Sequence, residues 1–456
     1  MKDCLVGKNI KVKITSFGPH GEGKGEAFER KIFIKNALMG EVHDVEIIKT
    51  SYDYLIGKSL SLEKESVSSY RVRAEEIACS YYGRCGGCQL MHMTKEGQHH
   101  LKEEMVRNSF HEKKLTISLD AIGASPLFHQ YRNKVQLPIS LSREQKMVIG
   151  PFRQNSNDVV DIASCLIHQQ IGDDAFKKIK TLLQNIWPED KVSHLKHLHL
   201  RTSEKEKKVL VCLVGRDSYI EVKEILHRLW SALKKENVIA GLFYNHNESD
   251  YNAVFSSNFH HVGGQKVIQE RVLDKDFSLS CESFFQVNRL QAELIYSELI
   301  EDLNLQKSDV VFDAFCGIGT ISLLLAEKVS KVYGVEIIEQ AINNARENAR
   351  LNAVQNCEFI CGKAEECDYL AEKATVLVVN PPRKGLDKKM VQFIARSHKI
   401  KKMVYISCNP ATLARDVSML KKMCEEKKRP FTIKKVKPFD MFPQTAHVET
   451  LCSLEF

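Results

Sequence analysis

The sequence lacks long apolar runs, internal repeats and low-complexity linkers. No segment approaches the length of about 18 apolar residues that a membrane-spanning helix needs, so we expect no membrane partner. Residues 1–9 contain no apolar stretch of the kind that marks a secretory leader, which predicts a cytoplasmic protein. With 43% hydrophobic and 27% charged residues, the 456-residue chain is typical of a globular protein with two or three domains.

Cysteine, in contrast, is abundant, with 14 residues in the chain. In a protein without a leader, so many cysteines argue against a disulfide scaffold and favour reduced thiols, metal ligands or catalysts. The net charge of +8 suits a polyanionic partner. Residues 421–437 carry eight Lys or Arg against two Glu, which indicates either a contact with phosphate groups or an ordinary solvated surface.

The N-terminal region, residues 1–62, has the pattern of a small β domain. Apolar and polar residues alternate from Asn9 to Ile14, and short apolar segments follow at 46–48 and 54–56. Between them, Gly18–Phe28 has four glycines in eight residues, and we expect it to form a loop. Short strands with a glycine-rich loop predict an oligonucleotide-binding (OB) type barrel.

The rest of the chain divides into two further predicted domains. Residues 63–282 mix a polar helical pattern with strand patterns and predict a mixed α/β central domain. From 283 to 456, apolar strands alternate with helical segments, the first of which Asn288 is expected to cap. Such alternation is typical of an α/β fold with a doubly wound, mostly parallel sheet.

A glycine loop follows the first strand of that C-terminal sheet. Asp313–Thr320 contains two glycines, which allow the backbone to approach a ligand, and the next strand ends at Glu336. An acid at that distance can accept both hydroxyls of an adenosine ribose. Because the third glycine of the dinucleotide motif is absent, the pattern favours S-adenosylmethionine over a nicotinamide cofactor. A glycine pair beside an unrelated surface Glu is the simpler alternative.

Two turns and an acid are expected at the same edge of the sheet. Asn380 ends one predicted strand, Cys408 follows the next, and Glu449 lies just before the last. A strand-end cysteine alone is more often a packing residue. A thiolate, however, can add to C6 of uracil, after which C5 attacks an electrophilic methyl group and a base removes the C5 hydrogen. Cys408, Glu449 and the glycine loop supply what this chemistry needs.

Six motifs in the C-terminal half resemble those of the S-adenosylmethionine-dependent RNA uracil-5-methyltransferases: F-F-Q-V-N (284–288), D-A-F-C-G-I-G-T (313–320), G-V-E (334–336), N-P-P-R-K-G (380–385), S-C-N-P-A-T-L-A-R-D (407–416) and H-V-E-T (447–450). The resemblance implies a Rossmann-like methyltransferase domain with Cys408 as nucleophile and Glu449 as base. It also implies that the methyl-donor site is lined by Gln286, Phe315, Thr320, Glu336 and Asn380.

One position departs from the family. Asn380 stands where these enzymes usually have Asp. An Asn can still accept the N3–H of uracil and can in addition donate to O4. Asn380-Pro381-Pro382 also resembles amino-methyltransferases, so an RNA amino-methyltransferase is an alternative. Those enzymes place an aromatic residue next, where this chain has Arg383.

Four further cysteines form a ligand pattern. Cys79, Cys85 and Cys88 have the spacing C-x₅-C-x₂-C, and Cys165 follows later in the chain. Four thiolates suit zinc or an iron–sulfur cluster, and the spacing does not separate the two. The resemblance does, because the family's ribosomal-RNA members carry a [4Fe–4S] cluster on this pattern. Four unrelated cysteines are the simplest alternative.

The N-terminal residues also resemble a family module. Residues 1–62 resemble the TRAM domain, an RNA-binding barrel, and together with the cysteine pattern they point to 23S ribosomal RNA as the partner, with the chain acting as a monomer. The target uridine is expected to be extruded from a single-stranded or refolded loop. Lys24 and Lys31 are candidate phosphate contacts. A transfer-RNA enzyme, a non-catalytic RNA-binding protein and a zinc-stabilised module remain as alternatives.

Overall fold

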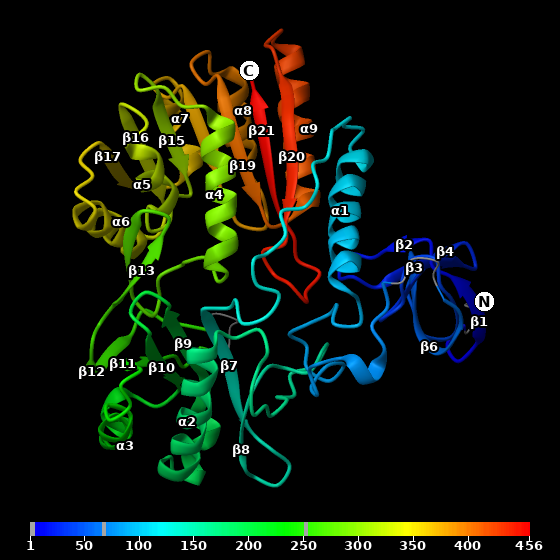
Figure 1. Ribbon diagram of the computed structural model, residues 1–456, viewed down its shortest axis with the longest axis vertical. Coiled ribbons are helices and arrows are strands. Elements are labelled where there is room, and N and C mark those ends of the chain that lie inside the picture. Colours follow the sequence, from blue (N-terminus) through cyan, green and yellow to red (C-terminus); the bar gives the residue numbers. More distant parts are fainter. Residues whose placement is uncertain (1–4, 66–69, 250–253) are drawn as a thin grey trace.

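The computed structural model describes residues 5–65, 70–249 and 254–456, and within these ranges the strands form four sheets. Figure 1 shows the seven-stranded sheet at one end of the molecule, the central sheet at the other, and the N-terminal sheet to the side, beyond α1. The expectation about a secretory leader came from residues 1–9, of which residues 1–4 lie outside the described ranges. No described helix is long and apolar enough to cross a membrane.

The N-terminal sheet has the order β1-β5-β6-β4-β3-β2. Its strands are β1 (Asn9–Lys13), β2 (Ser16–Phe17), β3 (Gly23–Ala27), β4 (Arg30–Ile34), β5 (Val42–Thr50) and β6 (Tyr54–Lys64). Alternate residues such as Ile32, Ile34 and Val45 are fully buried, as the period of a strand requires. A small β module is therefore present, whereas the OB-type barrel stays a prediction.

The glycine-rich segment is not entirely a loop, and that prediction was wrong. Its second half forms β3, which pairs with β4. A Cβ atom added to Gly25 would lie 2.5 Å from Val12 Cγ1 and 2.6 Å from the carbonyl oxygen of Lys13. The glycines therefore allow two backbones to approach closely, a use of glycine in strands that a turn pattern does not reveal.

The central sheet has the order β12-β11-β10-β9-β7-β8. The elements of this region are η1 (Ala74–Glu76), α1 (Lys95–Glu112), β7 (Lys134–Leu141), β8 (Met147–Ile149), α2 (Gln170–Ile186), η2 (Glu189–His194), β9 (Leu195–Ser203), β10 (Lys208–Gly215), α3 (Tyr219–Leu233), β11 (Ile239–His246) and β12 (Phe259–Gly264). Helices α2 and α3 cover one face through buried residues such as Phe176 and Leu226. The other face contributes Leu210, Cys212 and Val214 to the core of the C-terminal half.

The C-terminal sheet has the order β17-β16-β15-β18-β19-β21-β20, and a two-stranded ribbon, β13-β14, precedes it in the chain. The elements are β13 (Ile268–Val272), β14 (Lys275–Leu279), α4 (Arg289–Leu303), β15 (Val310–Ala314), α5 (Thr320–Ala326), β16 (Lys331–Glu336), α6 (Glu339–Leu351), β17 (Cys357–Cys361), η3 (Ala364–Glu366), α7 (Asp368–Ala371), β18 (Val376–Val379), α8 (Lys388–Arg396), β19 (Lys402–Ser407), α9 (Pro410–Glu426), β20 (Thr432–Phe439) and β21 (Glu449–Glu455).

This sheet is parallel except where β21 pairs with β19 and β20. Residues of α4, α5 and α6 form the core on one face, and those of α7, α8, α9 and α1 form the core on the other. Because both faces are covered, the strands are almost continuously buried, as in β18 and β19. The expected doubly wound methyltransferase-like sheet is confirmed.

Helix α4 shows where a sequence pattern succeeds and where it fails. Asn288 caps the helix as predicted, because its side chain accepts a hydrogen bond from the Gln291 N–H at 3.3 Å. The sequence spaces Leu290, Leu294, Ile295, Leu299 and Leu303 for one apolar face of this helix. Leu299 and Leu303 are buried, but Leu294 is 43% exposed. The helix therefore buries a narrower stripe than the sequence predicts.

Candidate active site

A cavity of about 1010 Å³ lies at the carboxyl ends of the parallel strands of the C-terminal sheet. Open α/β sheets of this kind bind their ligands at the carboxyl ends of their strands. The cavity wall includes every residue that the sequence assigned to the catalytic pair, the methyl-donor site or the cysteine set: Cys79, Cys85, Cys88, Cys165, Gln286, Phe315, Thr320, Glu336, Asn380, Cys408 and Glu449. Residues from more than 300 positions apart in the chain therefore share one site.

The glycine loop forms one wall of the cavity. It connects β15 to α5, and both Phe315 (φ 66°) and Gly319 (φ 82°) adopt left-handed backbone conformations. The Glu336 carboxylate, at the end of β16, accepts hydrogen bonds from Gly317 N–H at 3.3 Å and Ile338 N–H at 3.1 Å. The loop backbone and the acid are thus held together, as a ribose-binding acceptor requires.

Asp313, the first residue of the glycine-loop motif, was not assigned a role by the sequence. Its Oδ2 accepts a hydrogen bond from the Ser322 hydroxyl at 2.5 Å, whereas Oδ1 has no partner among the described residues. Burial raises the pKa of Asp313 to about 7. A charged residue inside an otherwise apolar strand is the signal that could have identified Asp313, because burying a charged group is energetically costly and such groups are often functional.

Cys408 lies directly after β19, in the turn that begins α9. Asn409 caps that helix by accepting a hydrogen bond from the Ala411 N–H at 3.1 Å, and the Ser407 hydroxyl accepts one from Asn409 N–H at 3.1 Å. These bonds hold the turn, and the Cys408 side chain is half-buried at the cavity wall. Burial raises the pKa of the Cys408 thiol, Glu449 raises it further, and the Arg383 guanidinium opposes both.

Glu449 opens the antiparallel strand β21 beside β19. Since Ser407 pairs with Thr450, the register places Glu449 across from the residue that follows Ser407, which is Cys408. The Glu449 side chain is only 3% exposed, and burial raises its pKa to about 8, against an opposing effect of Arg383. The structure therefore brings a thiol and a carboxyl with a raised pKa together at adjacent strand ends.

Arg383 was considered in the sequence only as evidence against a base-stacking residue. In the structure its carbonyl oxygen accepts hydrogen bonds from Asn409 Nδ2 at 3.3 Å and from the Thr412 hydroxyl at 3.2 Å. The turn that follows Asn380 is thereby tied to the turn of Cys408. The Arg383 guanidinium is also the positive group beside both the thiol and the buried acid.

The four cysteines of the ligand pattern occupy another wall of the same cavity. Gly87 N–H donates to Cys85 Sγ at 3.3 Å, and Cys165 N–H donates to Asp173 Oδ1 at 2.8 Å. Burial raises the pKa of the Cys88 thiol, and the three other thiols of the set raise it further. Burial also raises the pKa of Cys165 to about 11.

A metal site at these cysteines is not confirmed. Among the residues that the structure describes, no group of three or more His, Cys, Asp or Glu is arranged so that it could hold a metal ion. The residue types fit, because four thiols are the donor set of zinc or iron–sulfur sites. The four side chains also share one wall and influence one another's pKa.

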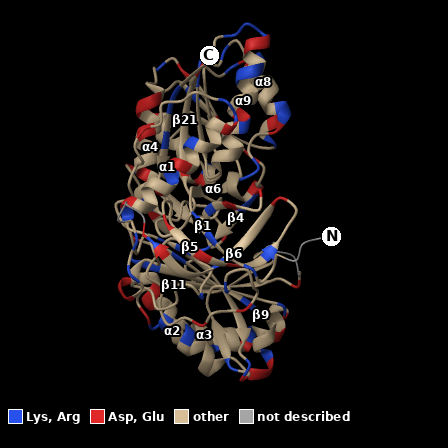
Figure 2. Cartoon of the chain, turned by 90° about the vertical axis from the view of Figure 1, so that its right-hand side faces the viewer, with Lys and Arg blue, Asp and Glu red and all other residues tan. Residues whose placement is uncertain are grey.

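The basic segment 421–437 is largely paired within the chain. Lys435 and Lys437 contact Glu298, and Lys434 contacts Glu455. Figure 2 shows Lys and Arg positions interspersed with Asp and Glu positions along the ribbon around α8 and α9. These three lysines therefore form ion pairs within the chain, and the choice between a phosphate contact and an ordinary solvated surface stays open for the rest of the segment.

Comparisons with known proteins identify the family of the chain. The family model described as tRNA (Uracil-5-)-methyltransferase matches residues 260–455. An uncharacterised RNA methyltransferase of Clostridium tetani is 36% identical over 468 residues, which cover 100% of this chain and 98% of the relative. One of Staphylococcus aureus is 35% identical and covers 96% of both chains.

A solved structure has the same fold over nearly the whole chain. The Pyrococcus abyssi tRNA (uracil-54, C5)-methyltransferase in complex with S-adenosyl-L-homocysteine matches with a TM-score of 0.75 and 22% identity, covering 98% of this chain and 100% of its own. At that identity the match shows the fold alone. The full-length relatives and the family model instead establish the protein family. The chain belongs to the S-adenosylmethionine-dependent RNA uracil-5-methyltransferase family.

Proposed function

We propose that the protein methylates C5 of a uridine in RNA, with Cys408 as the nucleophile and Glu449 as the base. The observation that carries this proposal is the pairing of β19 with β21, which sets the two side chains at adjacent strand ends on the wall of one cavity. The glycine loop and Glu336 line the same cavity, so a methyl donor and a base can meet there.

The proposed reaction begins when the Cys408 thiolate adds to C6 of the uracil. The C5 carbon then takes the methyl group, which S-adenosylmethionine supplies as an electrophile, and S-adenosylhomocysteine is released. Glu449 removes the hydrogen from C5, the C6–S bond breaks, and the thiolate is regenerated. Arg383 favours the thiolate form of Cys408 against the effect of burial.

The methyl-donor site is assigned to Gln286, Phe315, Thr320, Glu336 and Asn380. Glu336 supports this assignment best, because its carboxylate is oriented by two backbone N–H groups of the site. Asn380, at the end of β18, also faces the base-binding space that Cys408 lines, and its amide can accept from N3–H and donate to O4. Asn380→Asp should keep or raise activity, and a large loss would show that the amide itself is required.

We propose 23S ribosomal RNA as the substrate, with the target uridine extruded from a loop into the cavity. The resemblance of residues 1–62 to the TRAM domain and the gathered cysteines support this substrate. Transfer RNA is the second candidate, because the Pyrococcus abyssi enzyme of the same fold acts on it and its structure covers 98% of this chain.

Labelled S-adenosylmethionine and undermethylated RNA distinguish the substrates. The protein is incubated separately with undermethylated 23S RNA and with undermethylated transfer RNA, and 5-methyluridine is mapped in each. Label in 23S RNA supports the proposal, and label confined to transfer RNA overturns the substrate. Methylation of an exocyclic amine that survives in Cys408→Ala would instead show the amino-methyltransferase alternative, since that chemistry needs no thiol.

We further propose that Cys79, Cys85, Cys88 and Cys165 hold a [4Fe–4S] cluster with a structural or RNA-docking role. The support is that all four thiols line the cavity and that the other three raise the pKa of Cys88, so a positive centre is needed to keep them deprotonated together. Anaerobically purified protein should be brown and contain iron and sulfide. A colourless protein with stoichiometric zinc would contradict this proposal.

A further inference from the structure

The segment between β20 and β21, residues 440–448, leads directly to Glu449. It is neither helix nor strand, yet Phe442, Thr445 and His447 from this segment line the cavity. Gln444 has a left-handed backbone conformation (φ 72°), which a non-glycine residue keeps only when its surroundings impose it. The position of the segment therefore depends on contacts made by other parts of the chain.

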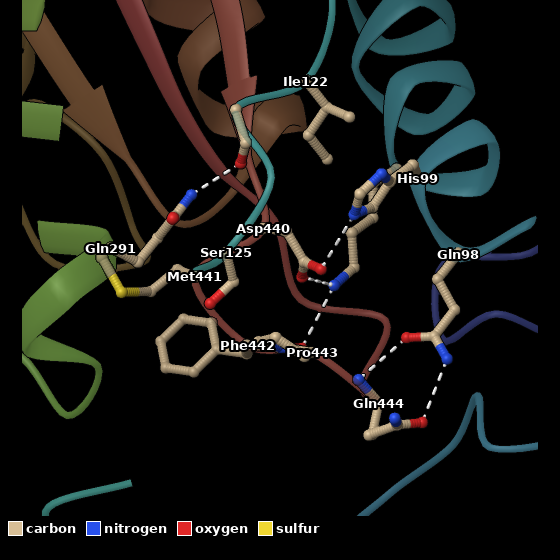
Figure 3. Close-up of polar contacts among 12 residues, drawn as sticks. Gln98, His99, Ile122, Ser125, Gln291, Asp440, Met441, Phe442, Pro443 and Gln444 are labelled. Carbon is tan, nitrogen blue, oxygen red and sulfur yellow. Dashed lines mark hydrogen bonds and ion pairs between the residues drawn. The ribbon is translucent and has the colours of Figure 1, made fainter. Parts of the chain in front are cut away.

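The first of these contacts comes from Lys102 of α1. Its side chain is fully buried, its ammonium group pairs with Asp440 Oδ1, and it donates to the Phe442 carbonyl oxygen at 3.1 Å. His99 Nε2 lies 3.3 Å from Asp440 Oδ2. Figure 3 shows the Asp440 carboxylate pointing toward α1. Burial raises the pKa of Asp440, but Lys102 and His99 outweigh it and hold the pKa below its usual value.

The second contact is a reciprocal pair of amides. Gln98 Nε2 donates to Gln444 Oε1 at 3.0 Å, and Gln444 N–H donates back to Gln98 Oε1 at 2.8 Å. Figure 3 shows the two side chains facing each other. The Gln444 carbonyl oxygen accepts from Gln89 N–H and Leu90 N–H, both at 3.0 Å. The left-handed residue is thus bonded through its side chain, its N–H and its carbonyl group.

The opposite side of the segment is held by α4 and the stretch before β7. Asn288 Nδ2 donates to the Met441 carbonyl oxygen at 3.1 Å, and the Tyr131 hydroxyl donates to that of Pro443 at 2.9 Å. Within the segment, the Thr445 hydroxyl donates to the Phe442 carbonyl oxygen at 2.8 Å and accepts from His447 N–H at 3.3 Å. A displacement at Asp440 or Gln444 therefore propagates toward His447 and Glu449.

We propose that Lys102 and Gln98 of α1 are positioning residues that set Glu449 for removal of the C5 hydrogen. This inference rests on the proposed function. Neither residue lines the cavity, so each acts through residues 440–448. A displacement of about 1 Å at a reacting group costs on the order of 100-fold in rate, so we expect a loss of that size in Lys102→Met.

The position of the loss in the reaction separates this role from a merely structural one. If only Glu449 is displaced, addition of Cys408 and methyl transfer continue, and the methylated RNA–Cys408 adduct accumulates. We expect kcat to fall about 100-fold and KM for RNA to fall with it, because kcat/KM depends only on the steps up to methyl transfer, which continue. RNA with 5-fluorouridine has no C5 hydrogen to remove, so Lys102→Met should form its adduct with that RNA at the wild-type rate. Simple loss of folded protein would slow both reactions equally.

Two further variants control for stability. Lys275→Met removes another buried lysine with acidic partners, Asp274 and Glu327, outside residues 440–448. It should keep the wild-type ratio of turnover to adduct formation with 5-fluorouridine RNA. Lys102→Met/Asp440→Leu removes both partners, which is often tolerated where removal of one is not. We expect the double variant to regain thermal stability but not turnover. Wild-type turnover in the double variant would overturn the proposal.

Failure of the proposed function would be visible separately. If the wild-type protein forms no adduct with 5-fluorouridine RNA, the proposed function fails, and the positioning role is judged by amide hydrogen exchange alone. Exchange at residues 440–448 should then rise in Lys102→Met and in Gln98→Leu but not in Lys275→Met. Unchanged exchange in the first two variants would overturn the inference.

Discussion

Two kinds of thiol face the same cavity, and their surroundings differ. Cys408 is a single thiol at a strand end, with the positive Arg383 and the buried acid Glu449 as neighbours. Cys79, Cys85, Cys88 and Cys165 lie on loops, and their charged neighbours are chiefly one another. The first arrangement suits the proposed nucleophile and base, whereas in the proposed cluster site the second would need a cation to remain deprotonated.

The largest effect is expected from Cys408→Ala. Without the thiol no bond to C6 can form, so methylation should fall by on the order of 10⁴-fold or more. The measurement is transfer of label from S-adenosylmethionine to undermethylated RNA. Cys361→Ala, which removes an exposed thiol outside the cavity wall, is the matched control and should keep wild-type activity. Substantial activity in Cys408→Ala would remove the contrast between the two kinds of thiol.

Glu449→Gln should cost less and should stop the reaction at a different point. A general base contributes about 10² to 10⁴-fold, and turnover should fall within that range. The adduct between Cys408 and methylated RNA should then persist on a denaturing gel, because the C5 hydrogen is no longer removed. Loss of both the adduct and the product would assign Glu449 to an earlier step.

The pH dependence sharpens the role of Glu449. A base must be deprotonated, and the pKa of Glu449 is about 8, so its contribution makes turnover rise by about tenfold per pH unit below that value and levels off above it. Cys408 must also be deprotonated to act as a nucleophile, and burial raises its pKa too, so its contribution likewise makes turnover rise with pH. A pH–rate profile of kcat tests this, and an activity maximum near pH 6 would contradict it.

The same pKa predicts an effect on stability. The folded protein holds the Glu449 proton up to about pH 8, whereas the unfolded chain releases it near the usual glutamate pKa of about 4.5. Between these values the folded state binds more protons, so the stability of the wild-type protein falls as pH rises. Glu449→Gln lacks this loss, so its melting temperature relative to wild type should rise from pH 5 to pH 8.

The smallest effect on catalysis is expected at the cysteine set. Cys88→Ser should release iron, bleach the brown colour and lower the melting temperature, whereas the reaction of Cys408 with 5-fluorouridine RNA should persist in the protein that stays folded. Cys408→Ala should keep the colour. Iron content, absorbance and adduct yield, measured on both variants, test whether the two kinds of thiol are independent.

The C-terminal half was well predicted because its patterns are local. Strands and helices alternate, Asn288 caps α4, and Cys408 follows β19 as expected. The failures are also physical. Gly23 and Gly25 indicate a loop in sequence, but they lie in β3 because their lack of a side chain permits close backbone contact. The exposure of Leu294 depends on what packs against α4, which no local pattern contains.

The sequence by itself determined the fold class of the C-terminal half and which strand-end residues meet in one cavity, because strand ends of a parallel sheet meet at one edge whatever the loops do. The tertiary structure alone decided that Arg383 lies beside Cys408 and Glu449, that Asp313 is buried with an unpartnered oxygen, and that Lys102 pairs with Asp440. Burial and charge at these positions arise from contacts between separate elements of the fold, which residue types and spacing do not specify.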